Sequence, residues 1–267
     1  MTAVTINAPQ AQMMMERLLV DMTTGANIIK PDGSQMRVED TVCIQPRCIK
    51  SKDAQKTRTK KKAEVFTPSW LCCRMLNDID EEWFGRKDVF NTMHGHTWVP
   101  TDGHIEFDGK TWREYVMYRG LEITCGEAPY ITSRYDTVTG DSIPINRRIG
   151  ILDRKLRVVT ENTDNEEDWL RWAEKAIQSV YGYEYQADNL LLARINVLLT
   201  YCEYMLAAIG REPTETELIS VTNIICWNLW QMDGLTDTIP GTNISCRICD
   251  WRAGHAIEFN ELKDGGI

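Results

Sequence analysis

The chain has 267 residues, of which 43% are hydrophobic and 26% are charged, an ordinary composition for a soluble globular protein with a buried core. No apolar run approaches the length of a membrane span, and the N-terminus lacks the basic and apolar regions of a secretory signal. The nine cysteines are scattered and often lie in apolar runs, which favours buried thiols over a disulfide framework. We therefore expect a cytoplasmic protein without a membrane association.

Charge is unevenly distributed along the chain. The net charge is −9, but residues 47–62 carry a local +7, so the remainder carries −16. A basic cluster gains affinity for nucleic acid by releasing counterions from phosphates, whereas a solvated surface arm is the alternative interpretation. The candidate DNA contacts are Lys56, Arg58, Lys60, Lys61 and Lys62. The acidic remainder fits a small DNA contact region, a protein partner, or mimicry of DNA.

Three regions are expected: an N-terminal appendage with a basic arm (1–62), an α/β domain with insertions (63–235) and a C-terminal tail (236–267). In the appendage we expect a short helix over about 11–22 and a Pro-Asp-Gly turn at 31–33. Residues 46–62 are polar and basic, which predicts a loop or mobile arm.

After residue 63 the signals for helices and strands follow one another closely along the sequence. Thr67 is expected to cap a helix that has Pro68 in its first turn and a face of Trp70, Leu71, Met75 and Leu76. The alternating run HIEFD at 104–108 predicts a strand.

The second half of the chain favours helices that alternate with short strands. The run from Glu166 has a helical apolar stripe, with Gly182 as its stop signal. A long helix capped by Asp188 and ended by Gly210 follows, and the T-E-T-E box at 214–217 opens another. We expect an α/β sandwich that binds its ligand outside the carboxyl ends of its strands.

Four stretches, in this order, resemble motifs of adenine-N6 DNA methyltransferases, the modification subunits of restriction systems. F-T-P at 66–68 resembles the F/Y-T-P that begins their cofactor site, and EITCGEAPYI at 122–131 resembles their D/E-P-x-C-G-x-G-x-F-L loop. GYEYQADNLLLARINVLL at 182–199 is similar to their next strand and helix, and NLWQMDGL at 228–235 more weakly to their D-x-L segment. The resemblance covers residues 63–235.

The resemblance implies a Rossmann-like fold that binds S-adenosylmethionine. It implies that Glu184 holds the ribose hydroxyls and that Asp233 contacts the adenine. The residues that it places near the cofactor or around its methionine part are Phe66, Thr67, Pro68, Glu122, Cys125, Gly126 and Ala128. Small residues in the loop suit a close approach of backbone to ligand.

The chain departs from the family in three ways. Cys125 and Glu184 are separated by an insertion that includes RRIGILDRKLRVV, and Ala-Pro replaces the glycine at the end of the loop. The D/N-P-P-Y/F motif, which in the family accepts from the adenine amino group and stacks on the flipped base, is absent. Asp250 and Trp251 are the nearest acid and aromatic pair after Asp233. The catalytic residues are therefore unassigned.

Metal sites are weaker candidates. Cys246 and Cys249 form a lone CxxC, whereas a structural zinc ion needs four ligands, so two reduced thiols are the simpler interpretation. His94, His96 and His104 could belong to a metal-dependent nuclease, or to a polar loop beside a strand. We assign no metal ligand.

Two main hypotheses remain. The first is a DNA adenine-N6 methyltransferase of a restriction-modification or phage setting, acting alone or with a second chain. The second is an inactive methyltransferase-like protein that blocks a DNA-binding protein or nuclease, as an anti-defence inhibitor. An enzyme is expected to place residues 47–62 beside an open cofactor pocket, and an inhibitor to show a filled pocket and a continuous acidic face.

Overall fold

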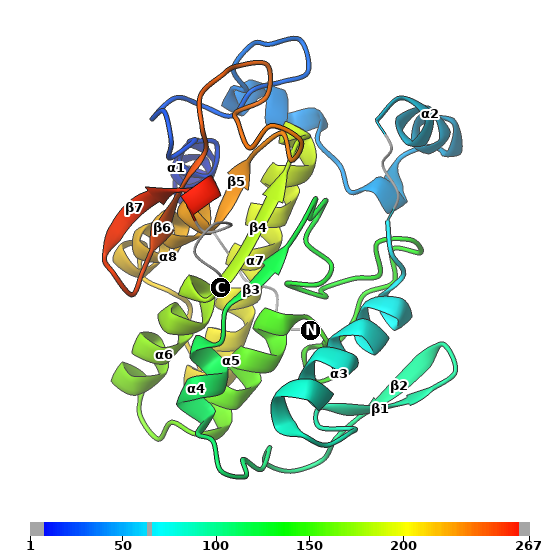
Figure 1. Cartoon of the computed structure of the whole chain (residues 1–267), viewed down its shortest axis with the longest axis vertical. Helices are drawn as coiled ribbons and strands as arrows, with labels where there is room; N and C mark the ends of the chain where they lie inside the picture. Colours follow the sequence, from blue (N-terminus) through cyan, green and yellow to red (C-terminus); the bar gives the residue numbers. More distant parts are fainter. Residues whose placement is uncertain (1–7, 63–65, 262–267) are drawn as a thin grey trace.

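The computed structural model describes residues 8–62 and 66–261, and Figure 1 shows how their elements are arranged. The α-helices are α1 (Ala8–Leu18), α2 (Lys52–Lys62), α3 (Ser69–Phe84), α4 (Trp112–Met117), α5 (Ile151–Glu161), α6 (Glu166–Gln178), α7 (Ala187–Ile209) and α8 (Glu215–Asn228). The strands are β1 (Asn91–His94), β2 (Thr97–Pro100), β3 (Gly120–Glu122), β4 (Val180–Glu184), β5 (Leu229–Gln231), β6 (Arg247–Asp250) and β7 (His255–Glu258). The 3-10 helices are η1 (Val38–Cys43), η2 (Arg47–Ile49) and η3 (Ile145–Arg147).

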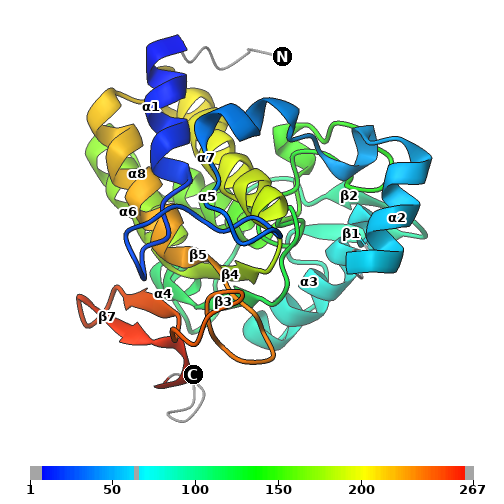
Figure 2. The ribbon, with the colours of Figure 1, turned by 90° about the horizontal axis from the view of Figure 1, so that it is seen from above.

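Strands β3, β4 and β5 form a parallel sheet in that order. Parallel neighbours need crossover connections, which α5 and α6 supply between β3 and β4, and α7 and α8 between β4 and β5. These helices lie on one face of the sheet, and the β6–β7 hairpin covers part of the other (Figures 1 and 2). The fold is therefore mixed α/β, with a three-stranded parallel sheet and flanking helices.

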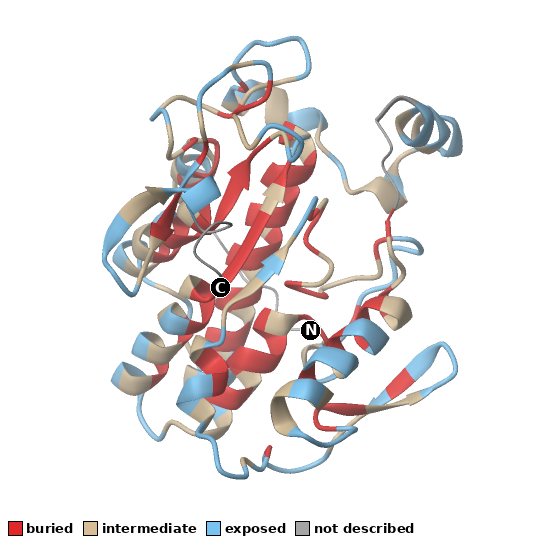
Figure 3. Ribbon diagram, viewed as in Figure 1, coloured by how far each residue is buried: buried red, intermediate tan, exposed pale blue. Residues whose placement is uncertain are grey.

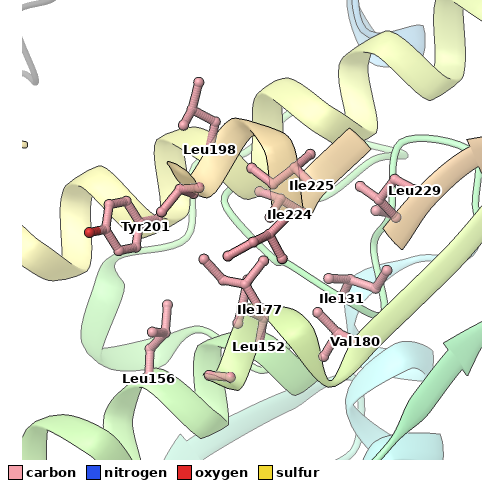
Figure 4. Packing of buried hydrophobic residues seen from close by; sticks show 14 of the residues in the cluster. Ile131, Leu152, Leu156, Ile177, Val180, Leu198, Tyr201, Ile224, Ile225 and Leu229 are labelled. Atoms are coloured by element: carbon pink, nitrogen blue, oxygen red, sulfur yellow. The ribbon is translucent and has the colours of Figure 1, made fainter. Parts of the chain in front are cut away.

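The main core lies between the sheet and its helices. Figure 4 shows Leu152 of α5, Ile177, Val180 of β4, Ile224 of α8 and Leu229 of β5 converging there. Because β4 is the central strand and meets side chains on both faces, its residues are among the most buried in Figure 3.

Helix α7 is the central helix of this core. Among the described residues it alone is long and apolar enough to cross a membrane, yet 72% of its most apolar window is buried inside the protein. The helix begins after Gln186 and ends at Gly210, which adopts φ 83°, as the glycine signal predicted. Asp188 is not its cap, because it lies in the first turn and pairs with cations of the N-terminal region.

The N-terminal region, expected to be an appendage, packs into the same core. Met14 and Leu18 of α1 are 2% exposed, and α1 lies against α8 and α7 (Figure 2). The fully buried Arg194 of α7 donates from Nη1 to the Val20 carbonyl at 2.9 Å and from Nε to the Leu229 carbonyl at 2.9 Å. This side chain ties the first turn after α1 to β5.

The predicted helix near the N-terminus is present, but α1 begins and ends earlier than residues 11–22. The turn at 31–33 is confirmed, since Gly33 adopts φ 83° and donates to the Lys30 carbonyl. The prediction of a loop over 46–62 was wrong, because residues 52–62 form α2. Its Lys, Arg, Gln and Ala residues have good helix propensity, and contacts to α7 hold it.

Helix α3 begins at Ser69, with Pro68 as its N-cap residue rather than in its first turn. The Ser69 amide donates to the distant Asp136 carboxylate at 2.7 Å, so the cap comes from another loop. The predicted apolar face was partly wrong. Its buried residues are Ser69, Cys72, Cys73, Leu76 and Asp80, whereas Met75 is 47% exposed.

The predicted strand at 104–108 was also wrong. Ile105 is buried in this run, but its amide donates to the Glu161 carboxylate at 2.9 Å instead of joining a strand ladder. The antiparallel hairpin of this region is formed earlier in the chain by β1 and β2.

Gly182 was predicted to stop α6, but it lies inside β4. Helix α6 ends at Gln178, with Ser179 as its C-cap. A Cβ on Gly182 would lie 2.9 Å from Leu229 and 3.2 Å from the Cys125 sulfur, so this position needs glycine for packing. The start of α6 and the capping box between Thr214 and Glu217 at the start of α8 are confirmed.

Candidate functional site

The carboxyl ends of the three parallel strands meet at one edge of the sheet. Strand β3 ends at Glu122, β4 ends at Glu184, and Asp233 follows the end of β5 by two residues. In open α/β sheets this edge is the usual place for a ligand. The tertiary structure thus brings together three acidic residues that are up to 111 positions apart in the sequence.

Glu184 binds the backbone of the loop that follows β3. It is 6% exposed, and its Oε2 accepts from the Gly126 amide at 2.9 Å, while Oε1 accepts from the Gln186 amide at 2.8 Å. The carboxylate therefore links the end of β4 to the loop and to the start of α7.

Glu122, at the end of β3, also binds the backbone of the loop that follows this strand. Its carboxylate accepts from the Ile131 amide at 3.1 Å and, at 3.4 Å, from the Tyr130 amide. Burial raises the pKa of Glu122 well above its usual range, and the neighbouring negative charge of Glu184 raises it further. Two carboxylates thus hold opposite ends of one loop, 126–131.

The loop has an unusual backbone. Thr124, Gly126 and Ala128 adopt φ values of 48°, 56° and 63°, in the left-handed region that favours glycine. The Cys125 amide donates to the Tyr183 carbonyl at 2.8 Å, which continues the β3–β4 pairing by one bond. The Cys125 thiol is buried beneath this turn, and burial raises its pKa, so it is a packing residue and not a nucleophile.

Of the F-T-P stretch at 66–68, Phe66 contacts this loop. A Cβ on Gly126 would lie 3.1 Å from the Phe66 ring, and the Arg47 guanidinium lies 5.4 Å from the centre of that ring. Thr67 is held elsewhere, because its carbonyl accepts from the Thr137 hydroxyl at 3.1 Å, outside the loop. Pro68 is the N-cap of α3 and has no described bond to the loop.

Asp233 is placed at the edge but within a turn of its own. Its Oδ1 accepts from the Leu235 amide at 3.0 Å, and its amide donates to the Thr238 carbonyl at 2.8 Å. Gly234 lies against the Tyr183 ring, which a Cβ would approach to 2.9 Å. The turn exposes Leu235, at 96%, beside the sheet edge.

Glu127 was not singled out from the sequence. It is 1% exposed, its Oε1 accepts from the Arg47 amide at 2.7 Å, and its Oε2 accepts from the Tyr135 hydroxyl at 2.5 Å. Asn196 of α7 also donates to the Glu127 carbonyl at 3.0 Å. The sequence signal that could have found Glu127 is an acidic residue in an apolar run, between Gly126 and Ala128. In the structure its carboxylate joins the loop to residues 47–62 through the Arg47 amide.

The basic arm lies beside this edge. Arg58 of α2 pairs with Asp188 at 2.7 Å and donates to Asn189 at 3.2 Å, both in the first turn of α7, and Lys50 pairs with Asp188 at 3.5 Å. Of the other candidate DNA contacts, Lys56 and Lys60 are exposed. The side chains of Lys61 and Lys62 lie outside the described residues.

The metal candidates are dispersed. No group of three or more His, Cys, Asp or Glu side chains among the described residues is arranged to hold a metal ion. His94, His96 and His104 are exposed, and His96 stacks on Trp70 at 4.1 Å between ring centres. Cys246 and Cys249 are buried free thiols, and Cys246 contacts the Gln231 carbonyl.

Comparisons of the chain with protein-family models, with curated proteins and with solved structures gave no match.

Proposed function

We propose that this chain is an S-adenosylmethionine-binding, DNA adenine-N6 methyltransferase-like protein of a restriction-modification or phage setting. We further propose that it requires a second chain for catalysis. The observation that carries the proposal is the convergence of the motif-bearing strands. The residues that resemble cofactor motifs lie at the carboxyl ends of β3, β4 and β5, on adjacent strands, with Phe66 against the loop after β3.

The cofactor would supply a methyl group, and the chain's own residues would bind and orient it. The positive-φ backbone of residues 124–128 offers small residues against which the methionine part fits. Glu184 is assigned to the ribose. Its carboxylate lies at the carboxyl end of the central strand β4, and an acidic residue at a strand end is the usual partner of ribose hydroxyls in dinucleotide folds.

DNA is proposed to lie along α2. Lys52, Lys56 and Lys60 are exposed at spacings of four residues, so they share one face of the helix. Arg58 faces the protein instead and holds α2 at the start of α7, four residues after Glu184. Phosphates bound by the lysine face therefore lie near the sheet edge.

A second chain is proposed because the described edge offers no substitute for the catalytic motif. The acid and aromatic pair at 250–251 does not reach it. Asp250 pairs with Arg119 at 2.7 Å, just before β3 begins, and Trp251 donates to Asn228 at 2.6 Å, just before β5 begins. Both lie at the amino ends of the strands, opposite the proposed cofactor site.

The inhibitor is a second candidate because the chain itself occupies part of the edge. Both oxygens of Glu184 accept backbone bonds, and the Phe66 ring covers Gly126. With a net charge of −16 outside residues 47–62, the same fold would suit a protein that blocks a DNA-binding partner.

Titration calorimetry with S-adenosylmethionine tests the proposal. We expect wild-type binding in the micromolar range, at least about tenfold weaker binding by Glu184→Gln because a charge-assisted bond to the ribose is lost, and no change in Glu167→Gln, which alters an exposed residue of α6. A folded wild-type chain that binds no cofactor would reject the enzyme and favour the inhibitor.

A further inference from the structure

A cavity of about 700 Å³ lies away from the proposed cofactor edge. It opens between the β1–β2 hairpin, η3, α5 and the C-terminal end of α7. Its volume falls within the range of small-molecule sites, about 300–1,000 Å³, which usually combine an apolar wall with a few polar groups. The apolar wall consists of Phe90, Trp98, Val99, Pro100 and Ile145.

Two buried polar side chains present an unused donor to this cavity. Tyr204 of α7 is 7% exposed, Asn91 of β1 is 2% exposed, and both line the cavity. The Tyr204 hydroxyl and the Asn91 Nδ2 have no hydrogen-bond partner within the described part of the chain, and neither atom is fully enclosed by protein. Because the small accessible surface of each residue faces the cavity, a ligand there can reach both groups.

Both side chains are held in one orientation by their surroundings. The Asn91 Oδ1 accepts from Asn77 Nδ2 at 2.9 Å and from the Cys73 thiol at 3.1 Å, which leaves the Asn91 amide nitrogen as a donor. Tyr204 packs in the main core, so its hydroxyl is fixed at the cavity wall. The site therefore offers donors that need an acceptor from elsewhere.

The four arginines that line the cavity differ in their charge compensation. Three of them pair with a carboxylate, and these pairs are Arg148 with Glu203, Arg154 with Asp80 and Arg157 with Glu161. Arg147 is exposed at the rim and has no ion-pair partner among the described residues. One positive charge at the cavity is thus uncompensated.

Arg147 is fixed beside the apolar wall. Its Nη2 donates to the Trp98 carbonyl at 2.9 Å, and the Trp98 indole donates to the Arg147 carbonyl at 2.7 Å. The guanidinium carbon lies 5.8 Å from the centre of the Trp98 ring. The exposed acid of the rim, Asp102, lies near Arg157, which donates to the carbonyls of the residues on either side of it.

We propose that this cavity binds a small aromatic carboxylate. The carboxylate lies at Arg147, the ring lies against the apolar wall at Trp98, and Tyr204 and Asn91 donate to acceptor atoms of the ligand. One uncompensated cation matches the single charge of a carboxylate better than the charge of about −1.5 to −2 of a phosphate monoester. Asp102 at the rim further disfavours a second negative charge.

Calorimetry of the full chain with indole-3-acetate tests this site. Tryptamine, which has the same ring and a positive charge, and acetate, which has the negative charge without the ring, are the comparison ligands. We expect indole-3-acetate to bind at least about tenfold more tightly than either, because only it satisfies both the apolar wall and Arg147. Equal binding of tryptamine or acetate, or no binding of indole-3-acetate, would overturn the proposal.

Arg147→Gln should weaken the binding of indole-3-acetate by about tenfold, because a charge-assisted bond is lost. Arg113→Gln is the matched control. Arg113 is also exposed and lies over a tryptophan ring, 4.6 Å from the centre of Trp112, but it does not line this cavity. Its substitution should leave the affinity unchanged.

Tyr204→Phe separates a role in binding from a role in folding. Since the hydroxyl has no partner among the described residues, its removal should not lower the free energy of unfolding, whereas the affinity for indole-3-acetate should fall by up to about tenfold. Glu184→Gln, at the proposed cofactor edge, should leave this affinity unchanged, so the two sites are tested separately. Unchanged affinity in both Arg147→Gln and Tyr204→Phe would show that the ligand binds elsewhere and that the proposal is wrong.

Discussion

Gly126 adopts φ 56° and lies against the Phe66 ring, so two separate constraints favour glycine at this position. Gly25 has a similar φ of 74° but no atom within 4 Å of the position that a Cβ would take. Comparing an alanine substitution at each position therefore separates the free-energy cost of the left-handed backbone from the cost of the contact with Phe66.

Gly126→Ala is expected to destabilise the protein more than Gly25→Ala. The left-handed conformation costs about 1 kcal/mol for alanine at both positions, and the ring contact adds roughly 1 kcal/mol at Gly126 unless Phe66 moves. Urea unfolding measures both values. Equal destabilisation by the two changes would show that the Phe66 contact is loose.

Asp80 of α3 and Arg154 of α5 form a buried ion pair that joins the two helices. The Asp80 carboxylate also accepts from the Tyr115 hydroxyl at 2.9 Å, and Arg154 donates to Asn77 at 2.8 Å. Burial raises the pKa of Asp80, whereas Arg154 lowers it. Each buried charge therefore depends on the other for its pairing.

Asp80→Ala should reduce the free energy of unfolding by about 3–5 kcal/mol, because it leaves Arg154 charged and unpaired in the interior. The control is Asp168→Ala, which breaks an ion pair with the exposed Arg171 and should cost less than about 1 kcal/mol. Thermal or urea unfolding of both variants provides the comparison. A loss below about 1 kcal/mol for Asp80→Ala would mean that water reaches Arg154.

At the scale of elements, α2 shows how a polar segment becomes ordered by a few contacts. Its outer face is exposed in Figure 3, and its inner face is fixed by Arg58 to the start of α7. The helix is thus a positively charged element at a defined place beside the sheet edge.

If α2 contacts DNA, the double variant Lys56→Ala, Lys60→Ala should weaken binding and lower the slope of log K against log salt by about 2, one for each lost phosphate contact. Fluorescence anisotropy with a DNA duplex at several salt concentrations measures the slope. Lys175→Ala, an exposed lysine on α6, is the matched control. An unchanged slope in the double variant would exclude α2 as the contact.

At the scale of the whole molecule, one buried lysine joins the sheet to its helices. Lys155 of α5 is fully buried and donates to Ser179 at 2.5 Å and to the Tyr118 carbonyl, at the amino ends of β4 and β3. Burial lowers its pKa to about 7. The folded protein therefore releases a proton that the unfolded chain, with a lysine pKa near 10.5, retains.

The stability of the wild type should consequently rise as the pH increases from about 7, because the unfolded state binds more protons there. One proton corresponds to about 1.4 kcal/mol per pH unit once Lys155 is neutral. The measurement is urea unfolding at pH 7 and 8.5, and Lys155→Met should lack this increment. If the free energy of unfolding rises equally in the wild type and in Lys155→Met, another titrating group causes the rise.

The sequence by itself determined the local features. The helices from Glu166 and Glu215, the C-terminal stop of α7 at Gly210 and the turn at Gly33 follow from periodicity, capping and glycine conformation, which act over a few residues. Cys125 to Ala128 and Glu184 were also recognisable as loop and strand-end residues. These signals do not depend on distant parts of the chain.

Only the tertiary structure decided the features that depend on residues far apart in sequence. Gly182 belongs to a strand because Leu229 and Cys125 pack against it, and residues 52–62 form a docked helix because Asp188 binds Arg58. Glu127 acquires its environment in the same way, from the Arg47 amide 80 positions earlier in the chain. Burial and electrostatic pairing are properties of spatial neighbours, which a local sequence pattern does not specify.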